Sequence, residues 1–311
     1  MSLGSLAAIS VLAAPLAAQN GGQTSASRGP VVLDLPSSTR GMALGGAFPV
    51  GAGGNLALFH HPALIAGEGF GGARQRLGGS THFALSGSGG WMGGAIAAGV
   101  SFLEYGTSAD SPLELPREPE ELIAGGDRAA SEYTAAVGFA DELFGVGVGA
   151  VAKLVGQRFE GLRGSTWAVD LGLARELGPI TGAVTVQNLG RVLKLGRYET
   201  PLARRVVVGA GTGSRAPVGP FDVGAAFQVA RDGRGEIIPG GGLEIAWWPI
   251  QRRVFIARIG AVRRVGEGDG SPLTFGAGFE GDRIRVDYAY RGAYTHLDTG
   301  AGRHSIGIAI R

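Results

Sequence analysis

The stretch Arg283-Ile284-Arg285-Val286-Asp287-Tyr288-Ala289-Tyr290-Arg291 alternates between two kinds of side chain. Its even positions are apolar or aromatic, and its odd positions are charged or small. A period of two is typical of a β-strand whose two faces meet different surroundings. The polar face carries three arginines and one aspartate, and the pattern recurs along the chain without helices to cover it. We therefore interpret the stretch as one strand of a membrane β-barrel, with its apolar face toward lipid and its charged face toward the lumen.

Composition supports a sheet protein in a membrane. The 311 residues are 44% hydrophobic and 17% charged, and 58 of them are glycine. This is too apolar for a disordered chain, and glycine costs about 1 kcal/mol per helix position relative to alanine. No stretch supplies the roughly 18 consecutive apolar residues of a spanning helix. A membrane protein without such a helix must close into a barrel, because only closure satisfies every backbone hydrogen bond in lipid.

Charge and cysteine content exclude several functions. The formal net charge is +2 and the basic residues are scattered, without a basic patch interleaved with aromatic residues, so nucleic acid is not an expected partner. The chain has no cysteine, which excludes disulfides and cysteine-ligated zinc. We expect no metal and no cofactor.

Alternating segments follow one another from residue 69 to residue 311. Their number is about fourteen, an even count as bacterial barrels require. The sequence thus predicts an all-β, transmembrane antiparallel barrel over 69–311. The candidates are 69–77, 80–88, 91–104, segments starting at Tyr133, Phe144 and Trp167, then 179–188, 202–213, 221–231, 236–248, 252–264, 272–281, 283–292 and 302–311.

The connections between these segments differ in length. Tight ones at 141–142, 177–178, 249–250 and 281–282 alternate with long or charged ones, which are 106–128, 157–163, 189–201, 265–272 and 293–302. Membrane barrels put long loops outside and short turns in the periplasm, so both termini are expected in the periplasm. Two connections break the alternation: 78–79 is very short for an outer loop, and 213–220 is long for a periplasmic turn.

Three tryptophans, Trp167, Trp247 and Trp248, fall near expected strand ends. In a barrel they fit an aromatic girdle at the lipid headgroups. The alternative is a soluble sandwich in which each tryptophan is buried.

The first 68 residues lack regular alternation. Residues 1–18 form an apolar run that ends in Ala17-Ala18, which predicts a secretory signal peptide and export to the outer membrane. A buried amphipathic helix is the alternative, although Gly4, Ser5 and Pro15 would weaken it. Residues 19–68 are expected to form a plug that packs against the barrel or inside it.

Within that segment, the chain resembles the PorV/PorQ family of outer-membrane proteins, a branch of the FadL-like barrels. The family has an Arg-x-x-x-Leu-Gly-Gly-Ala-Phe-like segment followed by Asn-Pro-Ala-Gly-Leu. Two departures are His61 in place of the asparagine, and glycines and an alanine at 51–54 in place of acidic residues. Weaker likeness continues at 186–190, 202–205, 276–279 and 287–290. The candidate plug-motif residues are Arg40, Leu44, Gly45, Gly46, Phe48, Asn55, His61 and Pro62.

This resemblance implies a non-enzymatic component of type IX protein secretion that holds or transfers secreted cargo proteins at the cell surface. The wider FadL-like group implies a second function, the passive transport of hydrophobic small molecules across the outer membrane. A structural barrel without transport is a third alternative, and a hydrolase is disfavoured because no catalytic motif is present. A transporter predicts an apolar patch in the lumen, whereas the polar faces of these strands are rather charged.

Nine charged residues fall on polar strand faces. On a lipid-facing position, an arginine at mid-membrane would cost about 2–4 kcal/mol, so these residues indicate which face points inward. Their mixed signs predict an internal salt-bridge network that fills a narrow barrel. The residues are Lys153, Asp170, Asp222, Glu244, Arg258, Arg283, Arg285, Asp287 and Arg291.

Three further motifs favour structural roles. The spacing Gly147-x-Gly149-x-x-Ala152, with Asp170 further on, matches a dinucleotide-binding fingerprint, but alternation continues where a helix should follow. His60 and His61 could share a metal, yet no third ligand lies nearby in the sequence, which favours a structural role in the plug. The acidic pair 120–121 lies in the long loop 106–128, a candidate surface for a partner or calcium.

Overall fold

The computed structural model describes residues 29–47, 54–106, 130–159, 161–212, 216–263, 271–292 and 302–310. The predicted signal peptide, Phe48 of the plug motif and the acidic pair 120–121 lie outside these residues. Four short helices precede the sheet and have no counterpart after it in the described chain. They are η1 (Val31–Leu33), α1 (Thr39–Ala43), η2 (Asn55–Phe59) and η3 (Pro62–Leu64). None of them has the length and hydropathy that crossing a bilayer requires.

Seventeen strands follow the helices in the described chain. They are β1 (Gly69–Leu77), β2 (Ser80–Trp91), β3 (Gly94–Glu104), β4 (Ser131–Leu143), β5 (Val146–Phe159), β6 (Leu162–Leu177), β7 (Ile180–Gly190), β8 (Leu193–Leu195), β9 (Tyr198–Thr200), β10 (Arg205–Thr212), β11 (Ala216–Val218), β12 (Phe221–Asp232), β13 (Ile237–Ile250), β14 (Arg253–Val262), β15 (Leu273–Glu280), β16 (Ile284–Arg291) and β17 (Arg303–Ile310).

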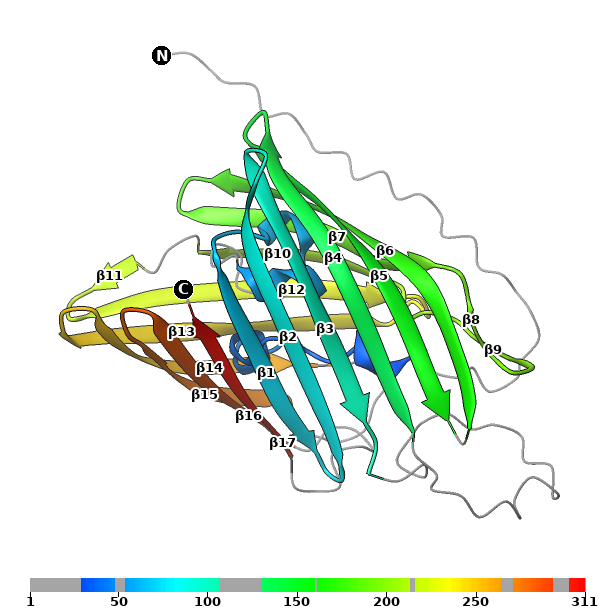
Figure 1. The fold of residues 1–311 in the computed structure, drawn as a ribbon. Coiled ribbons are helices and arrows are strands. Elements are labelled where there is room, and N and C mark those ends of the chain that lie inside the picture. Colours follow the sequence, from blue (N-terminus) through cyan, green and yellow to red (C-terminus); the bar gives the residue numbers. More distant parts are fainter. Residues whose placement is uncertain are drawn as a thin grey trace.

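The main sheet closes on itself (Figure 1). It has 15 strands, in which each wall strand pairs antiparallel with its neighbours in chain order. Closure comes from the pairing of β1 with β17, and the ring is continuous between β10 and β12. The short β11 pairs only with β12 and is not part of the wall, which leaves a closed barrel of 14 strands. The predicted fold class is therefore confirmed, although Phe144 lies in the turn before β5 rather than in that strand.

The two faces of the wall differ as the alternation predicts. Along β14, exposed and buried residues alternate at every position from Arg253 to Val262. Phe255 and Ile259, for example, are each 49% exposed on the outside, while Arg258 is buried inside. Trp167, Trp247 and Trp248 are exposed by 66%, 48% and 49%, so the alternative of a sandwich with buried tryptophans is wrong. The outer surface is a belt of large apolar side chains that only a lipid-like solvent accommodates at this extent.

Connection lengths distinguish the two ends of the barrel. At one end the connections β2–β3, β4–β5, β6–β7, β13–β14 and β15–β16 are short, and we call it the short-turn end. The opposite, long-loop end holds the connections after β3, β7, β14 and β16. The prediction of a long loop at 157–163 is wrong, since β5 and β6 extend to Phe159 and from Leu162. The chain between β7 and β10 contains a small hairpin, β8–β9.

Candidate functional site

The N-terminal segment lies within the barrel, where its helices contact strands from several parts of the wall (Figure 1). The first contact area lies beneath α1. This helix begins after Ser38, and the Ser38 Oγ accepts the Gly41 N–H at 3.1 Å. A Cβ on Gly260 of β14 would lie 2.4 Å from the Gly45 nitrogen, and one on Gly240 of β13 would lie 2.1 Å from the Gly45 oxygen. The plug backbone can approach the wall here only because the wall has glycine at these positions.

Hydrogen bonds fix the same contact area. Thr274 of β15 donates its hydroxyl to the Ala43 carbonyl at 3.0 Å and accepts the Gly45 N–H at 3.1 Å. Gly45 and the following Gly46 have φ of +68° and +78°, a conformation that side-chain-bearing residues rarely adopt. The Leu-Gly-Gly part of the plug motif therefore forms the turn that leaves α1.

The second contact area holds η2 and η3 against β1 to β6. A Cβ on Gly149 of β5 would lie 2.5 Å from the Ala63 nitrogen, and one on Gly172 of β6 would lie 3.2 Å from the His61 ring. Asn55 donates its side-chain N–H to the Ser86 carbonyl of β2 at 2.8 Å. Gly149 belongs to the sequence that matched the dinucleotide-binding fingerprint. In the structure this glycine contacts the plug backbone, and the whole matching sequence lies inside the continuous strand β5.

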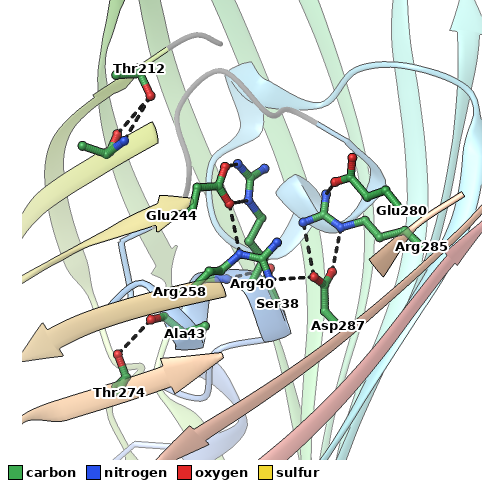
Figure 2. A network of polar contacts seen from close by, with 12 residues as sticks. Ser38, Arg40, Ala43, Thr212, Glu244, Arg258, Thr274, Glu280, Arg285 and Asp287 are labelled. Carbon is green, nitrogen blue, oxygen red and sulfur yellow. Dashed lines mark hydrogen bonds and ion pairs between the residues drawn. The ribbon is translucent and has the colours of Figure 1, made fainter. Parts of the chain in front are cut away.

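Four of the predicted lumen residues form one ion network on β13, β14 and β16 (Figure 2). Arg258 donates to Glu244 at 3.0 Å and to Asp287 at 2.8 Å. Arg285 donates to the same aspartate at 2.7 Å. Two residues that were not predicted as network members extend it. They are Arg40 of α1, whose Nε donates to Glu244 at 3.1 Å, and Glu280 of β15, which lies 3.3 Å from Arg285.

Arg40 is the ionic contact between the plug and this network. Burial lowers the pKa of Arg40 to about 10, against the opposing effect of Glu244, so the guanidinium stays charged at neutral pH. The sequence identified Arg40 as a motif residue and Glu244 as a lumen residue, but it gave no sign that the two meet.

A second buried group lies on β5, β6 and β7, separated along the wall from the first by β10 and β12. Lys153 lies 2.5 Å from Asp170, and their side chains are 4% and 0% exposed. A β-bulge places Asn188 beside them, because Val169 pairs with Leu189 while Leu171 pairs with Val186. Asn188, with φ of +59°, donates its backbone N–H to Asp170 and accepts from Lys153.

The structure does not bring all nine predicted residues together. Asp222 accepts from the Trp248 indole at 2.6 Å near the short-turn end. Arg283 is exposed in the turn before β16, and Arg291 is the last residue of that strand, at the long-loop end. Strand register places these three away from the two buried groups.

The long-loop half of the lumen contains an apolar region, which the sequence did not reveal. Inward-facing side chains of β1, β3, β5 and β6 meet the β8–β9 hairpin there, and Val32 and Leu35 of the N-terminal segment pack among them. The buried carboxylate of Glu132 accepts the Val32 N–H at 2.8 Å and the Tyr105 hydroxyl at 2.9 Å. We call this set the apolar cluster: Val32, Leu35, Leu77, Leu103, Tyr105, Ala130, Val155, Phe159, Ala168, Leu193, Leu195 and Leu202.

At the short-turn end, a cleft of about 310 Å³ opens between α1 and η2. Polar residues of the plug and the wall line it, among them Arg40, Asn55, Arg285 and Asp287. Two of the described plug-motif residues, Arg40 and Asn55, therefore line a cleft at the end of the barrel opposite the apolar cluster.

His61 makes the second contact area sensitive to acid. Burial lowers the pKa of His61 from 6.5 to about 4, so the seated plug holds this ring neutral. Between these two values the unseated state binds a proton that the seated state does not, so the stability of the seat falls as pH drops from 6.5 toward 4. We expect protease cleavage of the N-terminal segment in detergent to increase over this range in the wild type, and less so in His61→Asn. The exposed His304→Asn variant is the control, and equal acid sensitivity in all three proteins would contradict this role of His61.

No protein-family model matches the chain. A comparison with curated proteins likewise gives no match. Solved structures define the class of fold: a closed barrel of the FadL/TodX kind with an N-terminal segment. The toluene transporter TodX of P. putida superposes with a TM-score of 0.55 at 12% identity, over 89% of this chain and 97% of that one. The CymD monoaromatic hydrocarbon channel gives 0.56 at 10% identity, over 88% and 96%.

Proposed function

We propose that the protein is an outer-membrane channel for the passive uptake of hydrophobic small molecules, with the N-terminal segment, residues 19–68, as its plug. The apolar outer belt and the closed wall suit insertion into a bilayer, with the short-turn end toward the periplasm. The fold is shared with proteins described as hydrocarbon channels, which supports the same class of cargo.

The apolar cluster is the observation that carries this proposal. A lumen that conducts only water and ions needs polar walls, whereas this one presents fully buried leucines such as Leu77 and Leu103. Each methylene group that leaves water for such surroundings gains about 0.8 kcal/mol. In the closed state, Val32 and Leu35 of the plug fill the cluster. We propose that a hydrophobic molecule replaces these two side chains.

Release toward the periplasm then requires movement of the plug. The plug blocks the short-turn half through its two glycine-lined contact areas, and Arg40 ties it to Glu244. Apolar side chains of the plug, such as Leu58 and Ile65, add packing against the wall in the second contact area. A ligand that displaces η1 from the apolar cluster removes part of the plug's apolar packing and thereby favours the shift.

The type IX secretion role remains a prediction from the PorV/PorQ resemblance. It would be supported by co-purification of secreted proteins that share a C-terminal domain. Hydrophobic molecules bound to the purified barrel, without a protein partner, would instead support uptake.

Two substitutions with opposite effects test the uptake proposal. Leu35→Ala empties apolar space within the cluster, and such cavities take up benzene-sized molecules. We expect it to tighten binding of N-phenyl-naphthylamine, measured by fluorescence, about tenfold, since three lost carbons release up to roughly 2.4 kcal/mol of competing burial. Leu103→Gln puts an amide into the same cluster and should weaken binding by a similar factor. Toluene should compete with the dye in all variants.

Unchanged binding in both variants would contradict a ligand site at the apolar cluster. An exposed substitution in the β8–β9 hairpin, Lys194→Ala, serves as the control because its side chain is 71% exposed.

A further inference from the structure

A hollow of about 680 Å³ lies on the outer surface of the barrel at its short-turn end. It is formed between two short turns, β13–β14 and β15–β16. Its residues are Ile250, Gln251, Arg252, Arg253, Phe279, Gly281, Asp282, Arg283 and Ile284. The hollow is separate from the plug and from the apolar cluster.

Three arginines surround the hollow, and all of them are exposed. Within the described chain, the side chains of Arg252, Arg253 and Arg283 engage in neither ion pairs nor hydrogen bonds, unlike those of Arg40, Arg258 and Arg285 in the lumen. With Asp282 as the one acidic residue of the lining, the hollow carries a net charge of +2, which is three positive charges less one. A guanidinium group binds phosphate oxygens through paired N–H donors.

Aromatic rings continue from the hollow along the lipid-facing side. Phe279 lines the hollow and lies 5.4 Å, between ring centroids, from Phe255 of β14. Phe255 in turn lies 6.3 Å from Trp247 of β13. Exposed aromatic rings of this kind occupy the level of the headgroups in membrane barrels. The positive charge at the rim complements the phosphate group of a phospholipid, and the row of aromatic rings beside it complements the acyl chains.

We propose that this hollow binds one phospholipid with an anionic headgroup from the periplasmic leaflet. The phosphodiester lies among Arg252, Arg253 and Arg283, and the acyl chains lie along Phe279, Phe255 and Trp247. Ile250 and Ile284, which are 58% and 52% exposed, flank the start of the chains. This inference rests on the membrane location in the proposed function, but it does not depend on which molecule the channel transports.

Lipid binding to the detergent-purified, full-length protein tests the site. Native mass spectrometry would measure the affinity for phosphatidylglycerol and for phosphatidylcholine of matched chain length. We expect phosphatidylglycerol to bind more tightly, and each Arg→Gln substitution to weaken it about fivefold, or about a hundredfold in the triple variant R252Q/R253Q/R283Q. The matched control R163Q/R197Q/R234Q removes three exposed arginines from the long-loop end and should leave the affinity within about twofold.

Soluble glycerol phosphate, which has the phosphate but no acyl chains, is the second probe. Competition at the same concentration as the lipid would overturn the proposal, because the aromatic ladder would then contribute nothing. Equal affinity of the triple variant and the wild type would also overturn it. Flotation of the protein with vesicles made of phosphatidylcholine alone tests the membrane location separately from the lipid site. Failure to float contradicts the membrane location. A protein that floats but shows no preference for phosphatidylglycerol in mass spectrometry contradicts only the lipid site.

Discussion

Gly260→Ala is expected to unseat the plug while the barrel still forms. The new Cβ would lie 2.4 Å from the Gly45 nitrogen and 2.6 Å from the Leu44 carbonyl carbon, both in the plug backbone, so no side-chain rotation relieves the clash. Overpacking of this kind costs about 1–3 kcal/mol, which favours the displaced plug about 5- to 150-fold. The measurements are ion conductance in planar bilayers and protease cleavage of residues 29–68, and both should rise. Gly149→Ala, at the second contact area, should act in the same direction.

The outward-facing Gly182 of β7 provides the matched control. A Cβ at Gly182 would approach only the flexible side chain of Leu177, at 3.9 Å. Gly182→Ala should therefore leave conductance and cleavage unchanged, with the same heat-modifiable gel mobility as the wild type. If Gly260→Ala lowered barrel stability without exposing the plug, the clash would be relieved by the wall, and the glycine-lined contact would not hold the plug.

The wall of the barrel could be predicted from sequence because the alternation within each strand distinguishes its lipid-facing residues from its lumen-facing residues. A period of two needs no knowledge of neighbours, and the short turns mark where strands end. This is why predicted and observed strands agree at most positions from Gly69 onward. The ends that were wrong, such as Phe144 and the region 157–163, lie where the alternation continues past a turn or a turn is too short to recognise.

The plug contacts could not be predicted, because they depend on closure of the ring. Gly149 and Gly260 lie on strands far apart in the sequence, and nothing local distinguishes them from glycines that face lipid. The apolar cluster could not be predicted for the same reason. In the sequence, Leu77 and Phe159 are ordinary residues at the ends of alternating strands. Only their contact with Val32 in the structure shows that they face a filled lumen.

The positions of the charged residues could be predicted only in part. Glu244, Arg258 and Asp287, which the sequence assigned to polar faces, are buried in the structure, but their pairing depends on strand register. Glu244 lies directly opposite Arg258 on the adjacent strand. Asp287 is one strand further away, and Arg258 reaches it across Gly278, where a Cβ would lie 2.9 Å from the guanidinium. A glycine in the intervening strand thus decides which acid the arginine reaches.

Lys153→Met is expected to destabilise the barrel strongly. The substitution removes the cation and leaves the carboxyl group of Asp170 fully buried without its ionic partner, although it still accepts the Asn188 N–H. Breaking a buried ion pair from one side typically costs about 3–5 kcal/mol. The measurement is the free energy of unfolding in urea with the protein in lipid vesicles. The exposed pair Lys194–Glu199 is the control, and Lys194→Met should change that free energy by less than about 1 kcal/mol.

The double variant K153M/D170N separates charge from packing. It removes both charges, and the asparagine oxygen still accepts the Asn188 N–H, so the bulge between β6 and β7 keeps its hydrogen bond. Replacing a whole buried ion pair by neutral groups of similar volume is often close to neutral, so most of the loss in Lys153→Met should be recovered. A double variant as unstable as the single one would mean that Lys153 matters through its packed methylene chain rather than through its charge. In that case the bulge at Asn188 would be maintained by strand pairing alone, and the ion pair would fill the lumen without fixing the wall.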